Sequence, residues 1–258
     1  MSDLRVEPAT PSFDKTQKQP AQEKPKLSIK PIIGQVSFWL YVLVAVWQMG
    51  LSYMVNISLI LRSLAPTDKA NDLVFLAAES TIHVTIMSIG QSFGRFFFGY
   101  ISQYDKPSLF FNRSFQLLVM QTVLLVPCLI LAIAPTPSFS ILYFCSACVG
   151  LGFGGAGGLF PGIIREFFGM KQYGTAAGLV LAGVPISIVV STQIFGVYYD
   201  FETERQTSLV GKTECLGTSC YRTAYIIFSA IQIATVLFSL TLLVYRLRLK
   251  KRSIHPTN

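Results

Sequence analysis

Six long apolar runs constrain the fold of this chain more than any other feature of its sequence. They cover residues 37–61, 80–102, 115–134, 139–164, 173–199 and 224–245. Each is about 20 residues or longer, the length of helix that crosses roughly 30 Å of hydrocarbon. None shows the period-two alternation of a membrane barrel, and only 13% of all residues are charged. We therefore predict an all-α, polytopic membrane protein with six transmembrane helices.

The charged residues predict how the chain is oriented. Most of the 21 lysines and arginines fall on one side of the membrane if both termini are cytoplasmic. This pattern marks topology, so we predict contact with the lipid bilayer and none with nucleic acid. We expect three parts: a disordered cytoplasmic segment (1–36), a six-helix bundle (37–247) and a basic cytoplasmic tail (248–258). Such a multi-pass protein would belong to the plasma membrane or to a vacuolar or other organellar membrane.

Glycines recur at regular intervals in two of the runs. Gly90 and Gly94 thin one side of the second run, and the fourth run is rich in glycine. Residues 150–155 literally fit G-x-G-x-x-G, but they follow a helical run and no ribose-binding acid comes about 20 residues later. We predict close helix packing here and no cofactor. The fourth and fifth runs are expected to join through a tight charged turn at 165–172.

Polar side chains inside the runs are candidates for substrate binding. They are Tyr53, Asn56, His83, Gln91 and Gln193. His83 lies four residues after Glu79, so both face one side of a helix. Burying an ionisable group in a membrane costs free energy unless the group faces a cavity. This pair could therefore hold a proton or an anionic substrate. The alternative is an interfacial Glu79 that caps the helix and a His83 that only packs.

Arg95 lies about two turns from the end of the second run. One interpretation is an anchor whose charged head reaches the cytoplasmic surface. The other is a gate, in which Arg95 pairs with Asp105 or Glu166 in one conformation and releases it in another.

Three motifs, in chain order, resemble parts of the major facilitator superfamily. Residues 94–102, Gly-Arg-x-x-x-Gly-Tyr-x-Ser, resemble its cytoplasmic turn signature. Residues 160–169 and 173–178 resemble the turn between the tenth and eleventh helices of its monocarboxylate-transporter-like and nodulin-like branch. Residues 215–221 are similar to the C-x-G-x-x-C-[FY] feature of the nodulin-like group. The chain departs from the family at Gln103, where an acidic residue is common.

The resemblance implies that the six runs correspond to the C-terminal half of a twelve-helix facilitator. It implies alternating-access transport of a small organic solute, such as a monocarboxylate in this branch, by a half-transporter that needs a second half. That partner would be an N-terminal half or a second copy. The alternative is a truncated, non-transporting remnant or a regulatory membrane subunit.

The cysteines and histidines give little support to an enzyme. Cys215 and Cys220 fall in an outer loop, where an oxidising compartment would permit a small disulfide loop. Cys145 and Cys148 form a lone C-x-x-C inside an apolar run, which is weak evidence for a metal. The chain has only two histidines, and no Ser–His–Asp set or metal cluster can be assembled from its motifs. We therefore expect no catalytic residues and no metal.

Overall fold

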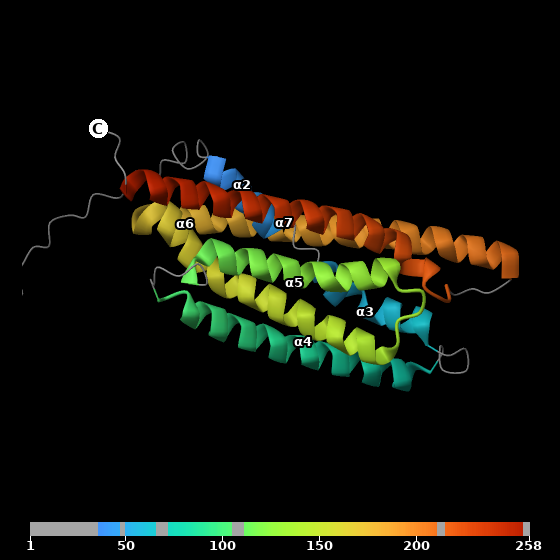
Figure 1. Ribbon diagram of the computed structural model, residues 1–258. Helices are drawn as coiled ribbons and strands as arrows, with labels where there is room; N and C mark the ends of the chain where they lie inside the picture. Colours follow the sequence, from blue (N-terminus) through green and yellow to red (C-terminus); the bar gives the residue numbers. More distant parts are fainter. Residues whose placement is uncertain (1–35, 47–49, 66–71, 105–110, 211–214, 255–258) are drawn as a thin grey trace, which may run out of the picture.

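The computed structural model describes residues 36–46, 50–65, 72–104, 111–210 and 215–254. Throughout these ranges the regular structure is helical, without strands (Figure 1). The helices are α2 (Val36–Val46), α3 (Gly50–Leu64), α4 (Leu73–Ile101), α5 (Arg113–Ile133), α6 (Phe139–Val210) and α7 (Ser219–Ile254). The all-helical prediction is therefore confirmed for the described chain. The predicted segment 1–36 lies outside it apart from Val36, and α7 continues into the predicted tail.

Four helices, α4 to α7, are long and apolar enough to cross a membrane. The first predicted run is covered by the two shorter helices α2 and α3, on either side of residues 47–49. The fourth and fifth runs both lie in α6, which is 72 residues long. A straight helix of that length would extend about 108 Å, more than three times the roughly 30 Å of a hydrocarbon core.

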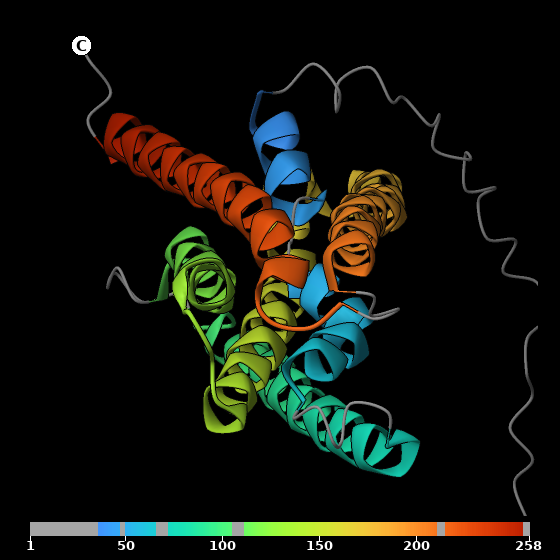
Figure 2. The same cartoon turned by 90° about the vertical axis from the view of Figure 1, so that its right-hand side faces the viewer.

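Helix α6 breaks at Gly169, within the predicted turn. Gly169 has φ 68° and ψ 175°, a backbone conformation that glycine adopts without the steric cost of a Cβ. The first arm of α6 (139–168) runs toward one end of the bundle, and the second arm (170–210) runs back (Figure 1). The first arm lies near the middle of the end-on view in Figure 2. As a whole, α6 contacts each of the other described helices.

A glycine seam joins α4 to the first arm of α6. Met87, Gln91 and Arg95 on α4 face Gly150, Gly154 and Gly158 on α6. A Cβ added at Gly154 would overlap the backbone carbonyl oxygen of Gln91, and one at Gly158 would lie 2.7 Å from that of Arg95. Gly94 is equally confined, since its Cβ would lie 2.7 Å from the Gly155 nitrogen. The predicted close packing is confirmed, because here the two backbones touch.

Helices α5 and α7 are joined by a buried pair of glutamines. The Gln232 amide nitrogen donates to the Gln121 side-chain oxygen at 2.9 Å and to the Gln121 backbone oxygen at 3.1 Å. Both side chains are fully buried. Hydrogen bonds of this kind hold helices together where apolar burial gives little preference for protein over lipid.

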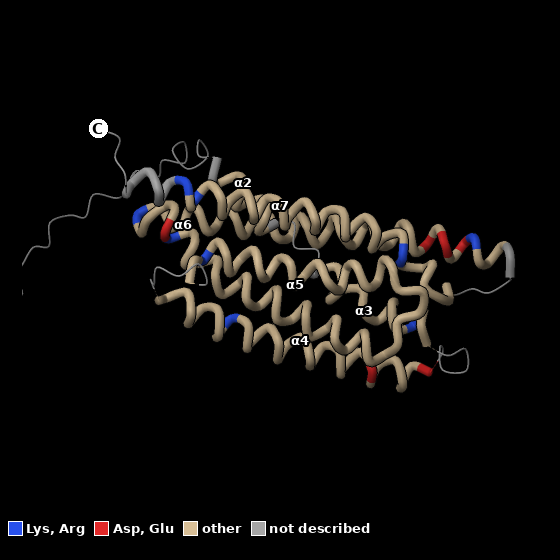
Figure 3. Tube along the Cα trace, in the orientation of Figure 1, with Lys and Arg blue, Asp and Glu red and all other residues tan. Residues whose placement is uncertain are grey.

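The two ends of the bundle differ in charge (Figure 3). At one end α4 finishes, α5 begins and α6 turns; its charged residues in the described chain include Arg113, Arg165, Glu166, Lys171, Arg246 and Arg248. We call this the basic end. The opposite end carries most of the described acidic residues and the Cys215–Cys220 disulfide. We call it the disulfide end.

Candidate functional site

A hollow of about 510 Å³ lies beside Arg95, between α2, α4 and both arms of α6. Its apolar walls come from Ala45, Phe153, Gly157, Phe160, Pro161, Ile164, Ala177, Val180, Leu181, Val184 and Pro185. Tyr173 adds a hydroxyl, and among these lining residues only Arg95 is charged. We call this space the Arg95 hollow.

The first arm of α6 leaves room for the arginine side chain. A Cβ on Gly157 would lie 3.5 Å from the Arg95 Nε atom, so the guanidinium lies along the glycine face of the helix. Arg95 is six residues from the end of α4, which corresponds to about 9 Å along the axis. Within the described chain, no carboxylate forms an ion pair with it.

A second hollow, of about 650 Å³, opens at the basic end. Arg113 and Arg165 contribute its charged lining, and Ser102 and Gln103 add polar groups. Pro161 and Tyr173 line both hollows. The two spaces are therefore neighbours, separated by the middle of α6.

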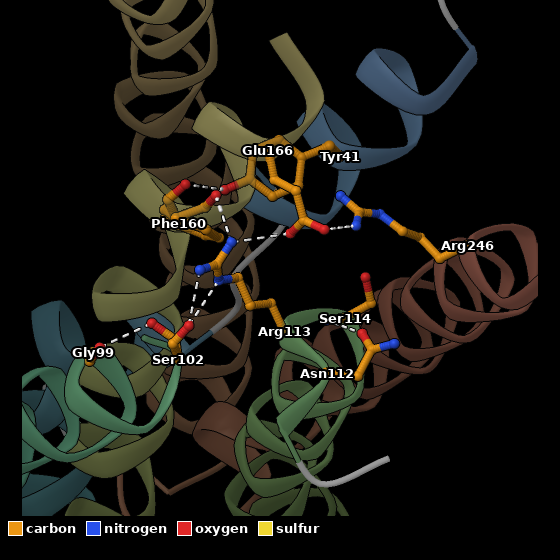
Figure 4. A network of polar contacts seen from close by, with 10 residues as sticks. Tyr41, Gly99, Ser102, Asn112, Arg113, Ser114, Phe160, Glu166 and Arg246 are labelled. Carbon is orange, nitrogen blue, oxygen red and sulfur yellow. Dashed lines mark hydrogen bonds and ion pairs between the residues drawn. The ribbon is translucent and has the colours of Figure 1, made fainter. Parts of the chain in front are cut away.

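Glu166 is the centre of a polar network at the basic end (Figure 4). One carboxylate oxygen accepts a hydrogen bond from Arg113 at 3.1 Å, and the other accepts one from Arg246. Arg113 also donates to the Ser102 backbone oxygen, at 3.0 Å from Nε and 2.9 Å from Nη2. Arg246 lies 4.0 Å above the Phe167 ring centre. The network thus joins α4, α5, α6 and α7.

The predicted pairing of Arg95 with Glu166 is not formed in this conformation. Glu166 is occupied by Arg113 and Arg246, and Arg95 faces its own hollow. Asp105 lies outside the described residues. Sequence reasoning missed Arg113 and Arg246 as partners, although Glu166 is the only acidic residue between positions 106 and 199. A single carboxylate among several arginines and lysines could have indicated that more than one of them would pair with Glu166.

Two of the predicted substrate residues, Tyr53 and His83, meet in a buried polar cluster. The His83 Nδ1 atom lies 2.6 Å from the Ser146 hydroxyl oxygen, which lies 3.0 Å from the Tyr53 hydroxyl. Nearby, the Tyr143 hydroxyl donates to the Glu79 carboxylate at 2.6 Å. Ser146 and Tyr143, both on α6, were not predicted.

The remaining predicted substrate residues are scattered. Asn56 is buried, but its amide donates to the Ser52 backbone oxygen on the same helix at 2.9 Å. Gln91 is half-buried beside the glycine seam, and Gln193 is exposed on the second arm of α6. None of the five predicted residues lines the Arg95 hollow. The structure therefore does not gather them into one site.

The disulfide end is closed by the loop between Cys215 and Cys220, which are joined by a disulfide with a Cα–Cα distance of 5.9 Å. The Gly217 nitrogen donates to the Ser63 oxygen at the end of α3 at 2.7 Å. The Thr218 hydroxyl donates to the Pro135 oxygen at 3.1 Å, just after α5. The Gln206 side chain accepts from the Leu216 nitrogen at 2.9 Å. The loop is therefore bonded to α6 and to the ends of α3 and α5.

The described residues contain no group of three histidine, cysteine or acidic side chains placed to hold a metal ion. Outside the disulfide, Cys128 and Cys145 are buried and Cys148 is half-buried. The charged residues that line the two hollows, Arg95, Arg113 and Arg165, are arginines, which suit an anion better than a metal ion.

A helical bundle with several long apolar helices defines a multi-pass membrane protein. The model of the NFD4 C-terminal domain, a nodulin-like family, matches residues 24–253, so the chain belongs to this family.

Sequence comparison finds similarity to an uncharacterized membrane protein of Saccharomyces cerevisiae, which is 23% identical over 217 residues. The matched region covers 80% of this chain and 39% of the relative. The chain thus spans about two fifths of that relative's length. No solved structure matches the chain.

Proposed function

We propose that this chain is the C-terminal half of a transporter of the major facilitator type and that it carries a small organic anion, such as a monocarboxylate. The observation that carries the proposal is the Arg95 hollow, an apolar space with one arginine on its wall. Membership of a C-terminal-domain family and similarity to a membrane protein support it.

The chemistry of the hollow suits an anion with an apolar body. A guanidinium can bind both oxygens of a carboxylate through two parallel hydrogen bonds. Apolar walls would accept the hydrocarbon part, and about 510 Å³ lies within the usual range for small-molecule sites. A charged residue in a membrane-spanning helix is costly unless it serves a cavity or a partner.

The second hollow would supply a route to the first. Its arginines, Arg113 and Arg165, would raise the local concentration of anions at the basic end. Tyr173 and Pro161, which line both spaces, would then separate the waiting anion from Arg95. By the excess of lysine and arginine, the basic end would face the cytoplasm.

In this proposal the chain crosses the membrane six times. The crossings are α2 with α3, then α4, α5, the two arms of α6, and α7. Transporters of this kind bind solute between two halves that rock against each other. The second half would be an N-terminal half or another copy of this chain. The solute would pass without covalent change, so the proposal includes no enzymatic step.

Uptake into proteoliposomes tests this function. The chain is reconstituted alone and together with a separately expressed N-terminal half of the same family, and uptake of radiolabelled pyruvate and benzoate is measured. Arg95→Gln should reduce uptake by about 10-fold or more, the effect of losing one charged hydrogen bond of 1.5–3 kcal/mol. Arg95→Lys should retain part of the activity.

Arg248→Gln is the matched control, because Arg248 is exposed at the basic end and lines neither hollow. Equal uptake by wild type and Arg95→Gln would remove Arg95 from the mechanism. Absence of uptake in both arrangements would favour a non-transporting remnant or a regulatory membrane subunit.

A further inference from the structure

His83 is a fully buried imidazole with one nitrogen bonded and the other unbonded. It is 0% exposed, and its Nδ1 atom lies 2.6 Å from the Ser146 hydroxyl oxygen. Its Nε2 atom is buried and has no hydrogen-bond partner among the described residues. A buried polar atom left unpaired costs about 1–3 kcal/mol, so the ring is kept in this position at a cost.

The bonding around Ser146 leaves Nε2 free for a proton. The Ser146 hydroxyl can donate to the Leu142 backbone oxygen, 3.1 Å away, and then accepts a hydrogen bond from the Nδ1–H group of His83. In that arrangement Nε2 is an unoccupied acceptor. A proton can therefore be added at Nε2 without breaking the bond between His83 and Ser146.

A counter-ion lies one helical turn away. Glu79 precedes His83 by four residues on α4, so the two side chains emerge on the same face. Its carboxylate accepts a hydrogen bond from the Tyr143 hydroxyl at 2.6 Å. The Tyr143 ring lies 4.8 Å from the His83 ring, at an interplanar angle of 33°. A positive ring at His83 would be stabilised both by the carboxylate and by the aromatic face.

The other titratable groups near His83 are neutral in their ordinary form. They are Tyr143 on α6, whose ring lies beside His83, and Tyr53 on α3, which shares the Ser146 hydroxyl with it, together with Cys145, Tyr221 and Tyr225 from the packed cluster that includes Tyr53. Arg62 lies nine residues beyond Tyr53 on α3. On α4, the charged residue closest in sequence to His83 is Glu79. Its side chain is only half-buried. Water at the disulfide end can therefore reach its carboxylate.

We propose that His83 is a proton-binding site with Glu79 as its counter-ion. A proton from water at the disulfide end passes by way of the Glu79 carboxylate to His83 Nε2, leaving Glu79 negative and the imidazole positive. The positive ring then competes with the Tyr143 hydroxyl for Glu79. Proton binding therefore weakens the hydrogen bond that joins α4 to the first arm of α6 at this end. This inference does not depend on the proposed transport.

The chain's two histidines make the test direct. His83 and His255 are the complete set, so His255→Asn leaves His83 as the single histidine. The protein is labelled with ¹³C-histidine in lipid nanodiscs, and the ring resonances are followed from about pH 8 to pH 5, across the range where histidine ordinarily changes charge. We expect the His83 resonance to titrate. Wild type, which retains His255, supplies the reference signal.

Two variants identify the counter-ion. Glu79→Gln removes the charge and should move the His83 midpoint down by about one pH unit, a tenfold loss of proton affinity. Tyr143→Phe removes the competing hydroxyl and should move the midpoint up. A His83 resonance that stays constant from pH 8 to pH 5 while His255 titrates would overturn the proposal. So would a midpoint that is unchanged in Glu79→Gln. Neither result would bear on anion uptake through Arg95.

Discussion

The two ends of this bundle are closed by different kinds of bond. At the basic end, Glu166 holds Arg113 and Arg246, and the side chains of these three residues are 38%, 25% and 19% exposed. At the disulfide end, a covalent bond closes a small loop, and backbone and neutral side-chain hydrogen bonds fix the loop to three helices.

The difference predicts which end would open in the proposed transporter. Ion pairs with solvent access are individually worth about 0–1 kcal/mol and are weakened by salt, so their partners can exchange at little cost. A disulfide does not exchange in this way. If the halves of a transporter rock against each other, we expect rearrangement of the Glu166 network and motion of the disulfide end as a unit. The glycine seam between the ends keeps α4 and α6 together.

The largest expected effect comes from the seam that connects the two ends. Gly154→Ala should lower the free energy of unfolding by about 3 kcal/mol, because the new methyl group would overlap the Gln91 carbonyl and force the helices apart. Unfolding in mixed micelles measures this. Gly178→Ala is the matched control, since nothing lies within 4 Å of a Cβ there. Equal stability of the two variants would mean that the seam is not close-packed.

The disulfide end can be opened by removing its covalent bond. The double variant Cys215→Ser/Cys220→Ser should lower the free energy of unfolding by about 2 kcal/mol, because closing a loop of this size removes conformational entropy from the unfolded state. Reduction of the wild-type protein should give the same loss. Cys148→Ser removes a free, half-buried thiol and should leave stability nearly unchanged. If reduction has no effect on stability, the disulfide does not hold this end together.

The basic end should respond less to a single change. Glu166→Gln should lower the free energy of unfolding by about 1.5 kcal/mol, because it weakens two partly exposed ion pairs that are each worth up to about 1 kcal/mol. Arg113 would keep its bonds to the Ser102 carbonyl. The difference from wild type should shrink at 1 M salt, where charges are screened over about 3 Å. If salt changes the stability loss of the cysteine double variant but not that of Glu166→Gln, the proposed difference between the two ends is wrong.

The smallest effect is expected from one neutral hydrogen bond at the disulfide end. Thr218→Val removes the bond to the Pro135 oxygen and should cost about 1 kcal/mol. Thr122→Val is the control, because the Thr122 hydroxyl bonds only within its own helix, to Leu118. Unfolding measurements on both variants, with the disulfide intact, separate this bond from the covalent closure. Equal losses would show that the contact between Thr218 and Pro135 adds no stability.

Some parts of the fold and site could be predicted because their signals are local. The apolar runs predicted the long helices, and the glycine spacing predicted close helix packing, although it did not identify α4 and α6 as partners. The turn predicted at 165–172 contains the break at Gly169. Arg95 was singled out because a charge inside an apolar run is unusual. Its hollow could not be predicted, because the walls come from α2 and from both arms of α6.

The sequence by itself determined the number and length of apolar segments, the imbalance of charge between their ends and the glycines that allow close approach. These depend on neighbours along the chain. Tertiary structure alone decided that Glu166 meets Arg113, 53 residues away, and that His83 meets Ser146, 63 residues away. Such pairs depend on how each helix is rotated about its axis. That rotation is set by packing against other helices, and apart from the glycine spacing on α4 and α6 no local pattern encodes it.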